Sequence, residues 1–116
     1  MAGGNQGAAH MRLKNEILLA LGCSDKLLIW NNPTGVFRGL HDSTVTRVGM
    51  PGQPDIIAIA APNGRFIGIE VKTGKGTLSD VQKCWKAQAE FRGALYIVAR
   101  SVNDVVLELS KHCIIL

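Results

Sequence analysis

A strand-turn-strand pattern in the middle of the chain constrains its fold more than any other feature. Two apolar runs, Ile56–Ala61 and Arg65–Ile69, flank the tripeptide Pro62-Asn63-Gly64. Asn-Gly between two apolar runs is a strong signal for a tight turn that joins antiparallel strands. The sequence therefore predicts a β-hairpin in which Asn63 and Gly64 form the loop and Pro62 pairs with Arg65.

Three polar residues flank the open end of this predicted hairpin. Asp55 precedes the first apolar run, and Glu70 and Lys72 follow the second. In the register set by a two-residue loop, Asp55 faces Lys72, and all three side chains share one face because strand side chains alternate with period two. A slip of one residue would turn Asp55 to the other face, unless it lies in a bend before the pairing starts, which Pro54 allows.

Two carboxylates and a lysine at this position suit a metal-dependent hydrolytic site. Carboxylates on neighbouring strands, roughly 7–8 Å apart on the diagonal, can both reach one hard cation. Magnesium prefers such oxygen ligands, and manganese is a natural substitute. The ammonium group of Lys72 could orient an attacking water or neutralise charge on a phosphate. An isolated Glu-x-Lys is usually an exposed strand pair, so the argument depends on its combination with Pro-Asp and the hairpin.

These motifs resemble those of a known enzyme family. Pro54-Asp55, Glu70-Val71-Lys72 and Leu78–Gln82 resemble the PD-(D/E)XK nucleases, and within them the VRR-NUC branch, over about Glu16 to Arg100. Val98-Ala99-Arg100-Ser101 stands in place of the Val-Arg-Arg signature of that branch and retains part of it. The resemblance implies a restriction-endonuclease-like mixed sheet and a divalent-metal-dependent DNA endonuclease, like the stand-alone phage and bacterial enzymes related to Holliday-junction resolvases.

The resemblance also implies roles for individual residues. It implies a metal site made by Asp55, Glu70, Val71 and Glu16. Glu16 lies close to the apolar stripe of the first predicted helix, where it could instead pair with Arg12 or Lys14. Gln82 falls in the first turns of the helix that follows Lys72, and the resemblance implies that its amide binds phosphate or a metal-bound water; taken alone, it would be an exposed helix glutamine.

The charge of the chain favours a polyanionic partner. The formal net charge is +4 and the sequence pI is about 9.2, which is compatible with DNA binding. Arg38, Arg47 and Lys75 are candidate phosphate contacts in Gly-rich segments, although surface cations are often only solvated. His41 has no visible partner and is not assigned to the site. Gly74-Lys75-Gly76 lacks the P-loop pattern, so we expect no nucleoside triphosphate.

The remaining segments complete an α/β pattern with the order αβββαβα. The predicted elements outside the hairpin are a helix over Arg12–Leu21 ended by Gly22, a strand over Leu27–Trp30, a helix that begins with Thr77 as its cap, a strand over Ala94–Ala99 and a helix over Ser101–Lys111. The last strand should be parallel to its neighbour because a helix connects them. Residues 38–53 are expected to form a long loop beside the hairpin.

The ends and cysteines of the chain suggest its organisation and compartment. Residues 1–10 resemble a disordered expression leader before Met11, and residues 11–116 have the length of one VRR-NUC-type domain. Cys23, Cys84 and Cys113 have neither disulfide nor zinc-site spacing. No apolar stretch has the length of a membrane span. We therefore expect a protein of the cytoplasm, in a bacterial cell or a phage-infected host.

The sequence-based hypothesis is a structure-selective DNA endonuclease that resolves four-way (Holliday) junctions as a homodimer. A small chain offers little surface for reading a long sequence, and a two-fold dimer would present two sites to two strands. A flap, single-strand or duplex nuclease could use the same site. A non-catalytic nucleic-acid-binding module and a structural or assembly protein are the alternatives from other classes.

Overall fold

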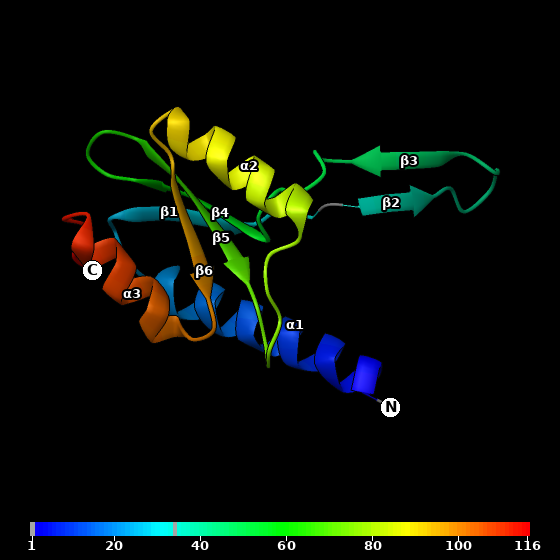
Figure 1. Cartoon of the computed structure of the whole chain (residues 1–116), viewed down its shortest axis with the longest axis horizontal. Helices are drawn as coiled ribbons and strands as arrows, with labels where there is room; N and C mark the ends of the chain where they lie inside the picture. The colour runs from blue at the N-terminus through cyan, green and yellow to red at the C-terminus, as the bar shows by residue number, and fades with distance from the viewer. Residues whose placement is uncertain (1, 34) are drawn as a thin grey trace.

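The computed structural model describes residues 2–33 and 35–116, which form helices on both sides of a β-sheet (Figure 1). In chain order, the elements are α1 (Ala2–Leu21), β1 (Leu27–Asn31), β2 (Gly35–Arg38), β3 (Val45–Val48), β4 (Ile56–Ala60), β5 (Arg65–Val71), α2 (Asp80–Phe91), β6 (Leu95–Ala99) and α3 (Val102–Lys111). Within these residues, none of the helices combines the length and hydropathy that crossing a membrane requires.

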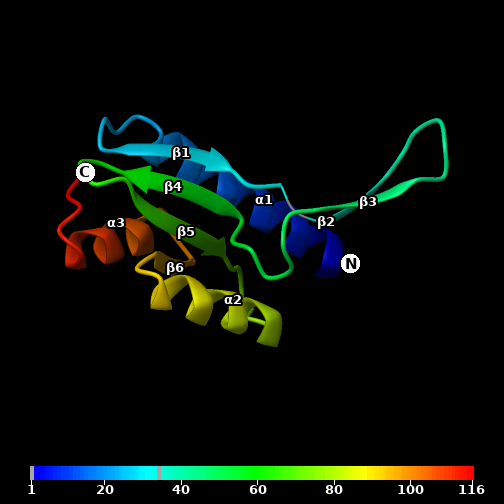
Figure 2. The same cartoon turned by 90° about the horizontal axis from the view of Figure 1, so that it is seen from above.

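The main sheet is mixed, with the strand order β1-β4-β5-β6. β4 is antiparallel to β1 and β5, whereas β6 is parallel to β5. α1 and α3 contact each other on one face of the sheet, and α2 lies on the other face (Figures 1 and 2). The prediction of a restriction-endonuclease-like α/β fold is confirmed, including the parallel strand that follows a helical connection.

The hydrophobic core lies between the sheet and the α1/α3 layer. Alternate residues of β5 point into it, and Ile67, Ile69 and Val71 are completely buried. Ile17 of α1 and Leu109 of α3 are also completely buried against this face. Because strand side chains alternate, Glu70 points to the opposite face, toward α2.

The register of the hairpin differs from the predicted one by two residues. Ala60 pairs with Arg65, so the loop comprises residues 61–64 rather than Asn63 and Gly64 alone. The prediction of a two-residue loop was wrong because the Gly64 N–H closes a wider turn by donating to the Ala60 carbonyl at 2.9 Å, with Gly64 at a φ of 70°. An even shift preserves the faces. Asp55 lies in a bend before β4 starts.

The segment predicted as a long loop contains much of a second, separate hairpin. β2 and β3 pair antiparallel, with Gly35 opposite Val48 and Arg38 opposite Val45. In both views this hairpin projects away from the main sheet (Figures 1 and 2). Its apolar and polar residues do not alternate clearly, because β3 is exposed along its whole length, so no periodic pattern marks it in the sequence.

The first helix also differs from its prediction. α1 begins at Ala2 rather than Arg12, so residues 2–10 are helical where we expected a disordered leader; Met1 lies outside the described residues. Ala8 and Ala9 are strong helix formers, and His10 contacts Asp55. Through His10, the first turns of α1 thus reach the polar end of the main sheet.

Gly68→Ala is expected to destabilise the protein by about 1–3 kcal/mol, because small-to-large changes in a packed core force neighbours to move. A Cβ at Gly68 would lie 2.7 Å from Cγ of Pro54, whose fully buried ring cannot rotate away. Urea unfolding of Gly68→Ala beside Gly7→Ala, whose Cβ meets no atom within 4 Å, measures the effect. An unchanged midpoint for Gly68→Ala would show that this contact can relax freely.

Candidate metal centre

Asp55 is held at the end of the main sheet by main-chain and side-chain hydrogen bonds. Its Oδ2 accepts a hydrogen bond from the Val71 N–H at 2.8 Å. Its own carbonyl accepts one from the Asn32 N–H at 2.8 Å, and the Asn32 amide donates to the Pro54 carbonyl at 3.0 Å. Asn32 was given no role in the sequence analysis. Its contacts show that it fixes the segment that carries Asp55.

Glu70 is a buried carboxylate with one oxygen unpaired. The residue is 3% exposed. Its Oε2 accepts a hydrogen bond from Gln82 Nε2 at 2.9 Å and lies 3.4 Å from Lys72 Nζ, whereas Oε1 has no hydrogen-bond partner in the described part of the chain. Burial and then the charge of Asp55 raise the pKa of Glu70 to about 7, against the opposing effect of Lys72. Such a group favours a proton or a cation beside it.

Gln82 connects α2 to Glu70 and Lys72. Its Oε1 accepts hydrogen bonds from Lys72 Nζ at 3.0 Å and from the Ser79 N–H at 2.9 Å. Ser79 is the N-cap of α2, and it forms a capping box with Gln82, so the prediction of Thr77 as the cap was wrong. Both ends of the Gln82 amide therefore contact protein groups, and the contact with Glu70 uses one of the two N–H bonds of Nε2. A contact of Gln82 with phosphate or water stays a prediction.

This arrangement suits a divalent cation. Asp55 and Glu70 provide carboxylate oxygens, and a cation would satisfy the buried Oε1 of Glu70. Val71 can contribute only its main-chain carbonyl, because its side chain is apolar and completely buried. Within the described residues, no three His, Cys, Asp or Glu side chains form a preassembled metal cluster. A divalent cation at this place would therefore need further ligands besides the two carboxylates.

Comparison with solved structures identifies the architecture. A structure described as a "VRR_NUC domain" superposes on the chain with a TM-score of 0.50 and 23% sequence identity, covering 92% of this chain and 95% of the other. The chain has the VRR_NUC fold. Neither a protein-family model nor a curated protein sequence matches it. The likeness agrees with the VRR-NUC assignment drawn from the Pro-Asp and Glu-x-Lys motifs.

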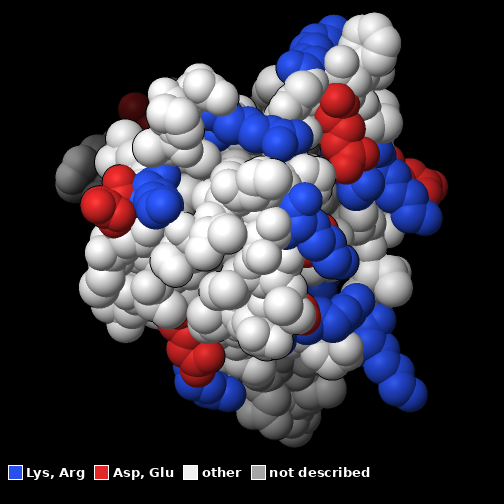
Figure 3. All heavy atoms as spheres, turned by 90° about the vertical axis from the view of Figure 1, so that its left-hand side faces the viewer, with Lys and Arg blue, Asp and Glu red and all other residues white. Residues whose placement is uncertain are grey.

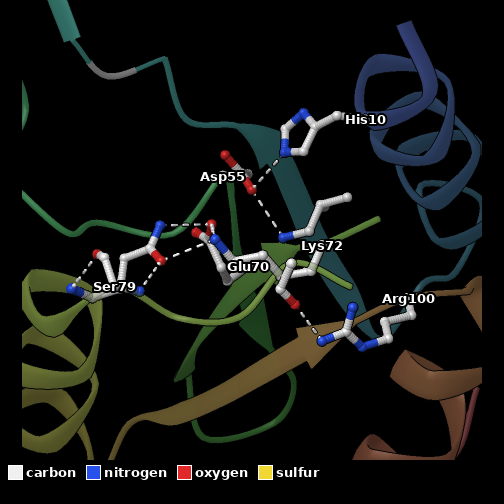
Figure 4. A network of polar contacts seen from close by, with 9 residues as sticks. His10, Asp55, Glu70, Lys72, Ser79 and Arg100 are labelled. Carbon is white, nitrogen blue, oxygen red and sulfur yellow. Dashed lines mark hydrogen bonds and ion pairs between the residues drawn. The ribbon is translucent and has the colours of Figure 1, made fainter. Parts of the chain in front are cut away.

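The first helix of this VRR_NUC fold brings His10, and not Glu16, to the candidate site. His10 Nε2 lies 3.2 Å from Asp55 Oδ2, and Figure 4 shows the ring extending from α1 toward the carboxylate. Glu16 is exposed, because six residues along a helix correspond to a rotation of about 240° and a rise of about 9 Å. Glu16 does not line the pocket that His10 shares with Glu70 and Lys72, and its role as a third carboxylate stays a prediction. His10 was missed because residues 1–10 were set aside.

The three basic residues predicted to contact phosphate lie in two different places. The β2–β3 register puts Arg38 and Arg47 on one face of the projecting hairpin. Lys75 lines a pocket of about 500 Å³ together with Glu70 and Lys72. Arg100, noted in the sequence only as a remnant of a signature, donates to the carbonyls of Gly74 and Gly76. It thereby holds the loop that follows Lys72.

The end of the molecule that carries the β4–β5 loop differs in its surface charge from the polar end of the sheet. Figure 3 shows the end that carries the loop between β4 and β5, where uncharged side chains occupy the centre and groups of both signs lie around the margin. Exposed Phe66 and Ile59 come from the strands next to this loop. Lys and Arg side chains lie along the right-hand side of this view rather than across its centre.

Proposed function

We propose that this protein is a divalent-metal-dependent DNA nuclease that hydrolyses phosphodiester bonds. The observation that carries the proposal is the buried, unpaired Oε1 of Glu70 beside Asp55 and Lys72, at the end of a sheet with the VRR_NUC fold. Evolution rarely retains a buried carboxylate without a partner unless the group serves a function. A binding module without catalysis would gain stability by replacing it.

Asp55, Glu70 and the Val71 carbonyl would hold the cation, which we propose to be Mg²⁺ or Mn²⁺. When bound, such an ion polarises the phosphodiester and makes water more acidic. The chain itself holds the ligands in place: the Val71 N–H fixes Asp55, and Gln82 fixes Glu70. Gln82 is thus a positioning residue in this proposal.

Lys72 supplies the positive charge near the reacting phosphate. Its Nζ is held by Gln82 Oε1 at 3.0 Å and by Glu70 Oε2 at 3.4 Å, and its side chain is 17% exposed. Because the ammonium is held in place before substrate arrives, little reorganisation is needed when negative charge develops. It would neutralise that charge or orient the attacking water.

Branched DNA is the substrate class that we propose, with four-way junctions as the first choice. The basic excess of the chain supports a polyanion, and Arg38 and Arg47 lie together on a hairpin that extends beyond the main body. Such an arm can contact backbone phosphates at a distance from the site without reading bases. Cleaving two strands of a junction requires two sites, so we propose a homodimer.

The surface supplies apolar area for such a homodimer. Leu40, between β2 and β3, is 94% exposed, and Phe91, at the end of α2, is 86% exposed. A groove of about 620 Å³ is lined by Met50, Val81 and Trp85 among others. These exposed apolar side chains and this groove are compatible with burial against a second copy.

Cleavage assays on defined substrates test the proposal. Four-way junction, duplex, flap and single-stranded DNA would each be incubated with Mg²⁺, Mn²⁺ or chelator, using Asp55→Ala as the inactive control. Paired nicks in the junction that require metal and Asp55 are expected. Cleavage of another substrate would replace the branched-DNA part of the proposal. Absence of cleavage on all four substrates, with DNA still bound, would favour the non-catalytic module.

Lys72→Ala is expected to reduce the cleavage rate by about 10²–10³-fold, because a preorganised charge near the developing phosphate charge is lost. Metal binding should persist, since both carboxylates remain. Single-turnover cleavage and calorimetric titration of Mn²⁺ measure the two effects separately. Lys111→Ala removes the same charge from the far end of α3 and should cleave normally; an equal loss in both variants would mean that only net charge matters.

A further inference from the structure

α2 covers its face of the main sheet only incompletely. The other two helices each bury apolar side chains against the sheet, such as Ile17 of α1 and Leu109 of α3. Within α2, all of which the structure describes, no residue is buried. Part of the sheet face beneath α2 is therefore open to solvent and has room for a ligand.

Three aromatic rings form a row between α2 and the sheet. The ring centroids of Tyr96 and Trp85 lie 5.9 Å apart, and those of Trp85 and Phe66 lie 6.3 Å apart. Tyr96 is 6% exposed and forms the buried end of the row, whereas Phe66 is 36% exposed. Phe66 is thus the exposed end, where a further planar ring could stack.

A pocket with basic sides lies at this exposed end. It has a volume of about 460 Å³, and Phe66, Trp85, Arg65 and Arg92 line it together with small residues. None of its lining residues is acidic, and the ion pairs among the described residues include neither arginine. Arg92 is held at the end of α2 by donating to the carbonyl and side-chain oxygens of Gln88 at 2.9 and 2.8 Å. Its other N–H groups remain able to bind an anion.

We propose that this pocket binds an unpaired nucleotide of single-stranded DNA. The base stacks on Phe66, and the guanidinium groups of Arg65 and Arg92 bind the adjoining phosphates. Aromatic rings beside cations are complementary to such a ligand, because every base has a face that can stack and every nucleotide carries a negative charge. The volume lies within the roughly 300–1,000 Å³ of pockets that hold small ligands.

The inference rests on the proposed nuclease function for its DNA partner and narrows the substrate. Phe66 and Glu70 share a face of β5 and lie four residues apart, which is about 13 Å at roughly 3.3 Å per residue. A stacked strand rises about 3.4 Å per nucleotide, so the bound base lies about four nucleotides from the proposed site. The pocket therefore favours branched DNA that offers unpaired bases over intact duplex.

Fluorescence of Trp85 tests the stacking in the metal-free protein. The chain has two tryptophans, so Trp30→Phe leaves Trp85 as the reporter beside the pocket. In chelator, an oligothymidylate of about 12 nucleotides, a length typical of single-strand binding sites, should quench this emission to saturation. The same strand paired with its complement should quench it much less, because its bases are not free to stack. Equal quenching by both would overturn base binding at this pocket.

Anisotropy of a labelled oligothymidylate measures what each group contributes. Phe66→Leu is expected to weaken binding about tenfold, and Phe66→Tyr, which keeps an aromatic ring, should restore the affinity. Trp30→Leu is the matched control, because Trp30 is 40% exposed and does not line the pocket. Arg65→Gln should reduce the slope of log affinity against log salt by about 0.7, whereas Lys111→Gln should leave the slope unchanged.

The outcomes separate this inference from the nuclease proposal. Unchanged affinity in Phe66→Leu, or an unchanged salt slope in Arg65→Gln, would overturn the nucleotide site and leave the proposed nuclease intact. A switch from dimer to monomer in Phe66→Leu, with its affinity kept, would also overturn it and assign the pocket to a second copy. Failure of the nuclease proposal looks different: the oligothymidylate would still bind through Phe66, but no DNA would be cleaved with any metal.

Discussion

Glu70→Gln is expected to abolish cleavage and, at the same time, to stabilise the metal-free protein. The rate should fall at least about 10³-fold, because a carboxylate ligand of the proposed cation is lost. The stability gain follows from burial: Glu70 is 3% exposed and its Oε1 is unpaired. The neutral amide can still accept hydrogen bonds from Gln82 and Lys72, without the cost of a buried charge.

The stabilisation depends on pH in a defined direction. The pKa of Glu70 rises from an ordinary value of 4.5 to about 7, chiefly through burial and then through the charge of Asp55. Between these values the folded protein keeps the proton that the unfolded chain has lost. The metal-free wild-type protein should therefore lose stability as pH rises from 4.5 to 7, and Glu70→Gln should lack this loss.

Thermal unfolding in chelator at pH 5 and pH 8 measures the stability gain of Glu70→Gln and its dependence on pH. We expect a Tm for Glu70→Gln on the order of 5 °C above the wild type at pH 8, and a smaller difference at pH 5. Added Mn²⁺ should raise the Tm of the wild type but not that of the variant. Glu108→Gln, which changes an exposed carboxylate paired with Lys111, is the control. A lower Tm for Glu70→Gln at pH 8 would contradict the view of Glu70 as an unsatisfied buried group.

Asp55→Asn is expected to lower the cleavage rate at least about 10³-fold with little change in stability. The amide oxygen of asparagine can still accept the hydrogen bond from the Val71 N–H, so the segment between Asn32 and β4 keeps its attachment. What is lost is the negative charge that a divalent cation requires. Asp55→Ala, in contrast, leaves the Val71 N–H without its partner and should cost about 1–3 kcal/mol in addition.

Comparison of the two Asp55 variants separates catalysis from folding. Single-turnover cleavage of the preferred DNA and urea unfolding would be measured for both variants, with Asp25→Asn in the exposed α1–β1 connection as the control. Equal rates for Asp55→Asn and the wild type, at saturating metal, would remove Asp55 from the proposed mechanism. A loss of rate in Asp25→Asn would point to net charge rather than to the site.

The sequence predicted the β4–β5 hairpin and its polar end because their signals are local. Apolar runs, a turn and flanking acids lie within a short stretch, and period-two alternation puts Asp55, Glu70 and Lys72 on one face even though the predicted register was shifted by two residues. Gln82 could be placed near them because it begins the next helix. The structure brings these four residues together, while their catalytic roles remain proposals.

The parts that the sequence did not predict depend on contacts between distant segments. Asn32 and His10 reach Asp55 across 23 and 45 residues of chain, and no local pattern records such a contact. At the start of the chain, Gly and Ala suggested a disordered leader, whereas α1 is helical from Ala2; whether residues 1–10 are a leader stays a prediction. Glu16 was favoured because it is the acid on the first helix, but helical rotation rather than residue type decides which side chain faces the pocket.

The projecting β2–β3 hairpin is structurally separate from the part of the molecule that positions Asp55 and Glu70. Its strands pair mainly with each other, and it lies apart from the layers that hold Asp55 and Glu70 (Figure 2). Insertions, deletions or substitutions in this arm should therefore leave Asp55 and Glu70 in place. The arm could therefore be exchanged by itself while the proposed nuclease site is kept.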